Sequence, residues 1–387
     1  MNMGSHINQT IRIIVVSAVR PEATSAGQVV LFRHLVDQPG IKWESYGSEP
    51  SRLTASSAIR RVAGRMSQTR LNRFAQDFWV WRDGQWLDEW LPQDVPAVGA
   101  VVLTVAQGDA CGAARRFAKR HHLPLVTFFH DWWPDMVSVH SPLRQLLEKQ
   151  FRELYDQSQL ALCVSERMRA LLGPHPNAHV LYPIPAKINP QLPSPTPAEC
   201  LRILYFGNLG EYGPMLADAL RALNHHTKVR LEVRGGNPRW PQDFQQKMEQ
   251  ERRWHGHARG AELEAWQRTA NAFLVPMVFE PAMRRRMETS FPSKMVEMAQ
   301  FGKPLVIWGP EYCSGVQWAR QGNRALCVTD PNPASLCQAL EKLAASPAEQ
   351  ERLAATAEQA AQSDFNPDKI QSQFLQALRG VLETGRK

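Results

Sequence analysis

The sequence of 387 residues has no run of about 18 apolar residues, so we expect no transmembrane helix. Its first residues have no basic segment followed by a cleavage site, and the apolar residues 11–16 are typical of a first β-strand. We therefore expect no signal peptide. The six cysteines form no Cys-x-x-Cys pair and have no histidine cluster at ligand spacing, which favours reduced thiols and argues against structural zinc. These absences favour a cytoplasmic protein.

Two motifs of nucleotide-dependent enzymes are missing as well. No Asp-x-Asp occurs in the chain, so a metal ion holding a diphosphate is not supported. The strand at residues 11–16 is not followed by Gly-x-Gly-x-x-Gly, which argues against a dinucleotide fingerprint. In its place stands a loop with Ser25 and Gly27, which suits a structural turn as well as a loop that contacts phosphate or acceptor.

The charge is unbalanced. Lysine and arginine outnumber aspartate and glutamate by 45 to 37, which gives a net charge of +8. Such a charge favours an anionic partner: nucleic acid, an anionic membrane surface or a phosphorylated substrate. We expect no nucleic acid, because the chain contains no recognised nucleic-acid motif.

The strongest basic bias lies in residues 58–78, and four tryptophans follow within residues 79–90. Cations beside indoles suit the interface of a membrane. The alternative is a solvated helix whose neighbouring tryptophans belong to the core. If the first reading holds, the protein docks peripherally on the inner face of the cell membrane. The arginines expected to contact that membrane are Arg60, Arg61, Arg65, Arg70 and Arg73.

A parallel-sheet pattern surrounds the pair His130 and Asp131. Residues 98–105 and 123–129 read as buried strands that flank a helix at 112–121. In open α/β sheets, ligands bind outside the carboxyl ends of the strands, and His130 and Asp131 follow the second strand directly. The pair is a candidate catalytic site, although an Asp in this place also serves as a structural cap.

Two domains are predicted. Six of the fifteen residues 183–197 are proline, a density that excludes helix and central strand. The strand pattern then restarts at 201–206. We assign 1–182 to an N-terminal Rossmann-like acceptor domain, 183–197 to the linker, 198–363 to a C-terminal Rossmann-like donor domain and 364–387 to a closing helix.

The richest stretch is residues 289–310, in which a polar turn, a helix and the buried strand 305–308 follow one another. Ser293 and Lys294 stand at the predicted helix start, where an anion binds well, and Glu297 lies one turn further on the same face. A nucleotide-sugar would explain all three residues, and an ordinary capped βα unit is the alternative. Glycines after the strand at 201–206 (Gly207, Gly210 and Gly213) suit close approach by a phosphate.

The layout resembles the GT-B glycosyltransferases: an α/β fold in which two Rossmann-like domains face a cleft and a C-terminal helix crosses back to the first domain. Within that fold, residues 297–305 (EMAQFGKPL) are similar to the Glu-Ala-Met-Ala-x-Gly-x-Pro-Val segment of the bacterial retaining, nucleotide-sugar-dependent group 1 enzymes. The preceding Pro-Ser-Lys resembles a variant found in polysaccharide and glycolipid enzymes. Thr289 stands where the group has its first glutamate.

The resemblance implies a glycosyltransferase of the hexosyl class. It implies transfer from a UDP-sugar to a polysaccharide or lipid-linked acceptor, with retention. Because Asp-x-Asp is absent, we expect no metal, and we expect no bound cofactor. Glu297 would hold the ribose, and His130 would contact the donor sugar. If the enzyme inverts instead, Asp131 would be the base. Gly27, with Ser25 in the same loop, would lie near donor phosphate or acceptor. The remaining donor-binding positions would be Gly207, Asn208, Gly210, Thr289, Ser290, Phe291, Ser293 and Lys294.

One family feature is absent. The group has an Arg and a Lys after its second-domain glycine loop, and this chain has neither. Arg234, or the cluster Arg284, Arg285 and Arg286, would substitute for them. Two further readings stay open: a catalytically degenerate copy that acts as a binding partner or scaffold, and a nucleotide-sugar epimerase.

Overall fold

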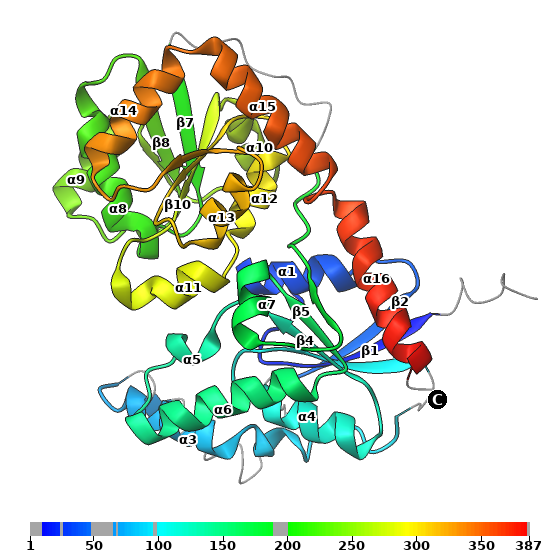
Figure 1. The fold of residues 1–387 in the computed structure, drawn as a ribbon. Helices are drawn as coiled ribbons and strands as arrows, with labels where there is room; N and C mark the ends of the chain where they lie inside the picture. Colours follow the sequence, from blue (N-terminus) through cyan, green and yellow to red (C-terminus); the bar gives the residue numbers. More distant parts are fainter. Residues whose placement is uncertain are drawn as a thin grey trace, which may run out of the picture. The chain divides into compact units, whose positions relative to one another are not determined.

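The computed structural model describes residues 10–23, 26–47, 65–66, 69–95, 99–188 and 200–384 (Figure 1). Its internal contacts divide the chain into two compact units. The first comprises Met1–Leu181 together with Gln371–Lys387, and the second comprises Tyr182–Ile370. The division falls where the proline-rich segment begins, and residues 189–199 of that region lie outside the described residues.

The first unit is built on a six-stranded parallel sheet in the order β2-β1-β3-β4-β5-β6. Every residue of β3 and β4 is buried, as expected for strands covered on both faces. The predicted strands at 11–16, 98–105 and 123–129 are found, the latter two slightly shortened. The strands are β1 (Ile11–Val16), β2 (Ile41–Tyr46), β3 (Ala100–Val105), β4 (Leu125–Phe129), β5 (Leu160–Cys163) and β6 (Ala178–Val180).

Helices cover both faces of this sheet. Phe117 of α4 and Phe151 of α6 belong to the core cluster on one face. On the other face, the ring of Phe374 in α16 lies 5.7 Å from that of Phe128 in β4. The helices are α1 (Ala26–Leu35), α3 (Asn72–Arg82), η1 (Gln85–Leu87), α4 (Ala110–Arg120), α5 (Trp133–Met136), α6 (Ser141–Gln157), α7 (Glu166–Leu172) and the closing helix α16 (Pro367–Thr384).

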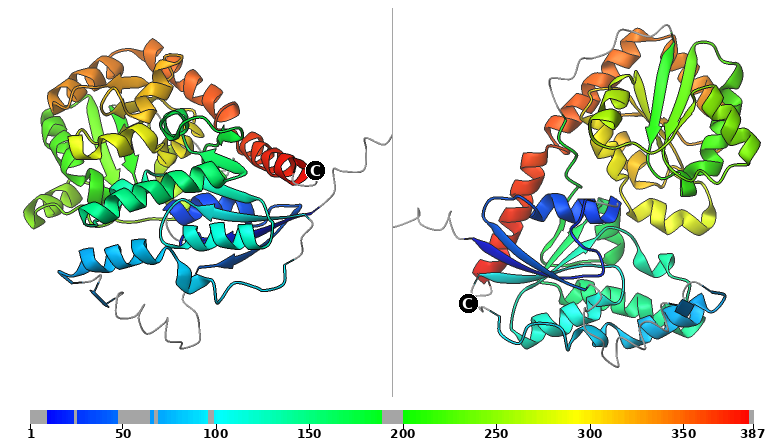
Figure 2. Two further views of the ribbon diagram at one scale, coloured as in Figure 1. Left: turned by 60° about the horizontal axis from the view of Figure 1, so that its bottom comes forward. Right: turned by 180° about the vertical axis from the view of Figure 1, so that it is seen from behind.

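The second unit repeats the design with a six-stranded parallel sheet in the order β12-β11-β10-β7-β8-β9. The right panel of Figure 2 shows its strands between layers of helices. Both β10 and β11 are buried throughout. The strands are β7 (Leu201–Phe206), β8 (Val229–Arg234), β9 (Trp254–His255), β10 (Ala272–Pro276), β11 (Leu305–Trp308) and β12 (Leu326–Val328).

The helices of the second unit correct one prediction. The expected glycine loop after β7 is largely helix, because α8 begins at Leu209 and contains Gly210 and Gly213. Asn208 caps this helix, and its side chain accepts a hydrogen bond from the Gly210 N–H at 2.9 Å. The helices are α8 (Leu209–Ala222), η2 (Leu223–His225), α9 (Gln242–Gln250), α10 (Gly260–Arg268), η3 (Pro281–Met283), α11 (Arg284–Thr289), α12 (Ser293–Ala299), α13 (Ser314–Arg320), α14 (Pro333–Ala344) and α15 (Pro347–Gln362).

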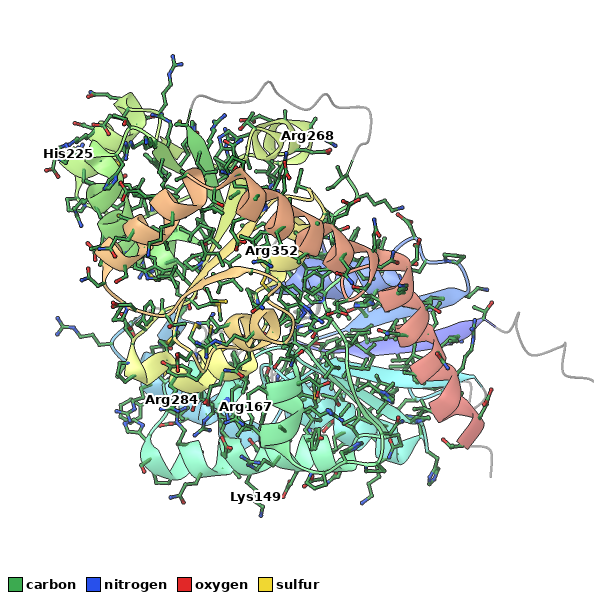
Figure 3. The ribbon with its side chains drawn as sticks, turned by 45° about the horizontal axis from the view of Figure 1, so that its top comes forward. Lys149, Arg167, His225, Arg268, Arg284 and Arg352 are labelled. Atoms are coloured by element: carbon green, nitrogen blue, oxygen red, sulfur yellow. The ribbon has the colours of Figure 1, made fainter. Side chains whose placement is uncertain are left out.

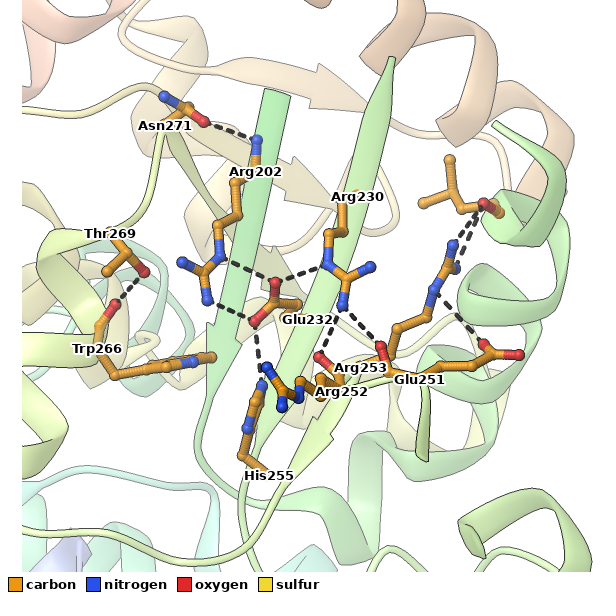
Figure 4. Close-up of polar contacts among 11 residues, drawn as sticks. Arg202, Arg230, Glu232, Glu251, Arg252, Arg253, His255, Trp266, Thr269 and Asn271 are labelled. Atoms are coloured by element: carbon orange, nitrogen blue, oxygen red, sulfur yellow. Dashed lines mark hydrogen bonds and ion pairs between the residues drawn. The ribbon is translucent and has the colours of Figure 1, made fainter. Parts of the chain in front are cut away.

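A buried carboxylate ties together three strands of this sheet (Figure 4). Glu232 of β8, only 3% exposed, accepts hydrogen bonds from Arg202 of β7, Arg230 of β8 and His255 of β9 at 2.7–3.0 Å. Burial alone would raise the pKa of Glu232, but the hydrogen bonds from His255, Arg202 and Arg230 outweigh it and lower the pKa to about 2. The network therefore keeps a charged residue stable inside the sheet.

Candidate functional site

The turn that follows β7 is the centre of the candidate site in the second unit. Gly207 has φ +148°, and a Cβ built on it would lie 3.7 Å from the Cγ of Lys294 in α12. The Nζ of Lys294 also lies 5.0 Å from the ring centroid of Phe206, the last residue of β7. The fold therefore brings two predicted donor-binding positions, Gly207 and Lys294, together at the carboxyl end of the strand.

Within α12 the two predicted charged residues contact each other. Lys294 Nζ lies 2.8 Å from Glu297 Oε2, an i,i+3 pair on one helix face. The side chain of Glu297 is 14% exposed and that of Lys294 is 37% exposed. The carboxylate is thus held close to the turn, while the ammonium group remains accessible to a ligand.

A second ion pair lies at the start of α8. Arg286 of α11 places Nη2 3.0 Å from Oε2 of Glu211, which stands in the first turn of α8. The sequence named Arg286 only as one member of a basic cluster, and it missed Glu211. No local sequence pattern predicts the pair, because Arg286 and Glu211 lie 75 positions apart in the sequence. Three helices therefore bring charged side chains to the turn after β7.

Two predicted donor-binding positions around residue 290 have hydrogen-bond partners within the chain. Thr289 is fully buried and ends α11, and its hydroxyl donates to the Arg285 carbonyl at 2.8 Å. The Ser290 N–H donates to the Arg286 carbonyl at 2.9 Å, and the Ser290 carbonyl accepts from the hydroxyl of Ser314. Because both groups already form hydrogen bonds within the chain, neither the Thr289 side chain nor the Ser290 N–H is available to bind a nucleotide-sugar donor.

Two further positions in this stretch have different surroundings. The side chain of Phe291 packs in an aromatic cluster, with ring centroids 4.7 Å from Tyr182, 5.9 Å from Phe365 and 6.4 Å from Trp318. Only its backbone could therefore face a ligand. Ser293 is half-buried and begins α12, where the first N–H groups have no partner within the helix.

Arg234, the other proposed basic substitute, lies elsewhere at the edge of the sheet. Its guanidinium pairs with Glu262 at 2.7 Å and lies 5.2 Å from the ring of Trp266. Together with Trp254 and His257 it lines a cavity of about 250 Å³ beside β9. The sequence did not single out Trp254 or His257, because a two-residue strand leaves no periodic pattern.

In the first unit, His130 and Asp131 directly follow β4, as predicted. His130 is half-buried, and its ring lies 5.4 Å from that of Phe128. Burial lowers the pKa of His130 to about 4, although the negative charge of Asp131 opposes this shift. The imidazole is therefore neutral near pH 7 and can both donate and accept a hydrogen bond.

A second histidine that the sequence did not reveal lies close to this pair. His34 of α1 is fully buried, and its Nδ1 lies 3.0 Å from Oε1 of Gln371 in α16. The Gln371 amide donates in turn to the His34 carbonyl at 3.0 Å. Burial lowers the pKa of His34 to about 4. This reciprocal contact joins the end of the chain to the first unit.

The remaining predicted residues have mixed outcomes. Ser25, Arg60 and Arg61 lie outside the described residues. Gly27 is the second residue of α1, and a Cβ there would meet nothing within 4 Å, so packing does not require glycine. Arg65, Arg70 and Arg73 are exposed, and Arg73 donates to the Val139 carbonyl at 2.9 Å.

The comparison with protein families finds a match within the second unit. Residues 201–346 match the family described as Glycosyl transferases group 1. This part of the second unit is therefore similar to group 1 glycosyltransferases. The matched segment spans β7, α8 and α12, and so contains both ion pairs at the turn. No curated protein matches the chain.

Solved structures are similar in fold over nearly the whole length of the chain. Sucrose-phosphate synthase from Thermosynechococcus elongatus has 13% identity and a TM-score of 0.62, covering 97% of this chain and 100% of that one. HepE from Anabaena, in complex with UDP and glucose, has 15% identity and a TM-score of 0.62, covering 96% and 100%. The α,α-trehalose-phosphate synthase (UDP-forming) from Burkholderia vietnamiensis has 13% identity and a TM-score of 0.61, covering 97% and 100%. The chain has the GT-B fold.

Two kinds of feature are absent from the described residues of this protein. Among its described residues, no three His, Cys, Asp or Glu side chains are grouped so that they could hold a metal ion. In the same residues, no helix has the length and apolar character needed to span a bilayer.

Proposed function

We propose that this glycosyltransferase moves a sugar from a UDP-sugar to a polysaccharide or lipid-linked acceptor, with retention and without a metal ion. The observation that carries the proposal is the convergence of Lys294, Glu297 and Arg286 at the turn after β7. Complexes of similar proteins support the choice of donor. HepE is described in complex with UDP-glucose, and TarM with UDP, Fondaparinux and α-GlcNAc-glycerol.

Charge explains how this turn would hold a diphosphate. Lys294 and Arg286 supply two positive charges, and charge-assisted hydrogen bonds to phosphate are among the strongest in proteins. The Glu297 carboxylate, held beside the turn by Lys294, would accept hydrogen bonds from ribose hydroxyls. Positive charge fixed beside the leaving diphosphate would stabilise the charge that develops as the glycosidic bond breaks.

The first unit would contribute His130 and Asp131. A neutral imidazole suits a hydrogen bond to a sugar hydroxyl, because it adds no charge beside the reacting carbon. With retention no general base is required. If product analysis shows inversion, Asp131 is the group we expect to accept the proton of the acceptor hydroxyl.

The first test is nucleotide binding, measured by thermal shift and calorimetry with UDP, GDP, ADP and CMP. A ligand that binds only the folded state raises the melting temperature. We expect UDP to do so, and Lys294→Ala to weaken its binding about tenfold or more through the lost charge-assisted contact. Lys303→Ala is the matched control, because Lys303 lies before β11, at the opposite end of the strands. EDTA should leave donor hydrolysis unchanged.

Failure of this test has a specific meaning. Thr289 replaces the glutamate of the group and is buried against its own helix, so it cannot hold the donor sugar. If no nucleotide shifts the melting temperature, the protein is better interpreted as a catalytically degenerate copy that acts as a partner or scaffold than as a transferase. If UDP binds and the donor sugar changes its configuration without transfer, the protein is a nucleotide-sugar epimerase.

A further inference from the structure

Helix α3 of the first unit has apolar side chains on two faces. One face is internal, with Ala75 and Val80 buried and α6 packed beside the helix. The other side chains are exposed: Leu71 is 48%, Phe74 57% and Trp81 64% exposed. Only five large apolar side chains are exposed in the described part of the chain, and these are three of them. One helix therefore concentrates apolar surface that the protein leaves uncovered.

These residues form a continuous outer strip. Leu71, Phe74, Phe78 and Trp81 follow one another at spacings of three, four and three, which places them on one side of a helix. The rings of Phe78 and Trp81 lie 6.4 Å apart, and the ring of Phe74 lies 5.0 Å from that of His140. We call these four residues the outer strip of α3.

Positive charge surrounds the outer strip. Arg65, Arg70 and Arg73 are exposed before and within the helix, and the guanidinium of Arg82 lies 6.0 Å from the ring of Trp81. The one acid within residues 69–82 is Asp77, and its carboxylate accepts a hydrogen bond from the His140 backbone N–H at 2.8 Å and contacts the His140 ring. The edge of the strip is therefore cationic.

We propose that the outer strip of α3 docks the protein on a bilayer that contains anionic lipids. Phe and Trp side chains suit the boundary between headgroups and acyl chains, and arginines bind the phosphates around them. A second copy of the chain fits less well. A symmetric pair built on this strip would bring the same arginines together, and like charges repel. This proposal goes beyond sugar transfer and does not depend on it.

The test uses the full chain and two kinds of vesicle: phosphatidylcholine alone, and phosphatidylcholine with phosphatidylglycerol as about a third of the lipid. In co-sedimentation we expect binding to the second kind only, and weaker binding as salt is raised. The double variant Phe74→Ser, Trp81→Ser should reduce the bound fraction about tenfold, because both side chains lose their apolar contact. Trp43→Ser is the control, since Trp43 is an exposed tryptophan on β2 of the same unit.

Charge is tested by a matched pair of variants. Arg65→Glu with Arg70→Glu should abolish binding to the anionic vesicles. Arg120→Glu with Arg379→Glu makes the same change of charge at exposed positions on α4 and α16, and should leave most binding in place. Equal loss in both variants would overturn the proposal, because binding would then follow net charge rather than the outer strip.

Fluorescence quenching by brominated lipid tests the same contact with conservative substitutions that preserve the fold. Vesicles with bromine on the acyl chains should quench part of the tryptophan fluorescence, and Trp81→Phe should remove that part whereas Trp43→Phe should not.

The proposal is overturned if the wild-type chain binds neither kind of vesicle, or if the Phe74→Ser, Trp81→Ser variant melts normally and still binds. It is also overturned if sedimentation velocity shows that the wild-type chain is a dimer and the double variant a monomer, and neither chain binds vesicles. UDP binding, measured without lipid, tests the transferase separately.

Discussion

Arg286 supplies a positive charge that the sequence does not provide near the turn after β7. We predict that Arg286→Met weakens UDP binding about tenfold, because one charge-assisted contact to the diphosphate is lost. Calorimetry would measure the change in Kd. The control is Arg284→Met, on the same helix (Figure 3). Arg284 lies 4.7 Å over the ring of Tyr312 and is 62% exposed. Equal effects of the two variants would remove Arg286 from the site.

His130 belongs to the other unit, and its expected effect is on turnover. We predict that His130→Ala lowers kcat at least tenfold while the Kd for UDP changes less than twofold, because the imidazole is proposed to contact the sugar near the reacting carbon. Steady-state kinetics and calorimetry separate the two quantities. A variant that loses UDP affinity but keeps kcat would contradict this role.

At the scale of the element, two glycines inside helices have opposite surroundings. A Cβ on Gly213 of α8 would lie 2.4 Å from the Pro238 carbonyl oxygen, whereas a Cβ on Gly380 of α16 would meet nothing within 4 Å. We predict that Gly213→Ala destabilises the protein by about 1–3 kcal/mol through overpacking. Gly380→Ala should stabilise it by about 0.5–1 kcal/mol through the lower entropy of its unfolded chain. Urea unfolding would measure both.

At the scale of the whole molecule, each unit has its own core and should respond to acid separately. The folded-state pKa values of His34 and His130 are lowered to about 4 from 6.5, so the unfolded chain takes up protons first as pH falls. The first unit should therefore be fully stable above pH 6.5 and lose stability as pH falls toward 4. His34 alone accounts for about 3 kcal/mol of this loss.

The second unit should respond later. The pKa of Glu232 is lowered to about 2 from 4.5, so its contribution persists above pH 4.5 and is lost as pH falls toward 2. Calorimetric scans at about pH 7 and about pH 5 should show a shift of the first unit's transition only. His34→Gln should reduce that shift. A larger shift in the second unit's transition would contradict the assignment.

Much of the fold follows from local pattern. Strands β1, β7 and β11 have the predicted bounds, because strands covered on both faces are almost entirely apolar. Only Arg12 in β1 and Arg202 in β7 interrupt these runs. The start of α8 was not predicted, because the sequence indicated a glycine loop there. Its glycines and Pro214 favour a loop locally, whereas the Asn208 cap and the packing of Gly213, whose carbonyl accepts from Trp240 Nε1 at 2.7 Å, stabilise helix there.

The sequence by itself determined the α/β class, the two-domain organisation as a prediction, and the candidate positions His130, Lys294 and Glu297, since each follows from the order of residues along a few turns of chain. Only the tertiary structure decided that Lys294 pairs with Glu297 beside Gly207, that Arg286 lies at the start of α8, and that Thr289 is buried. It also decided that Leu71, Phe74 and Trp81 of the outer strip are exposed, because a helical pattern with two apolar faces does not specify which one is covered.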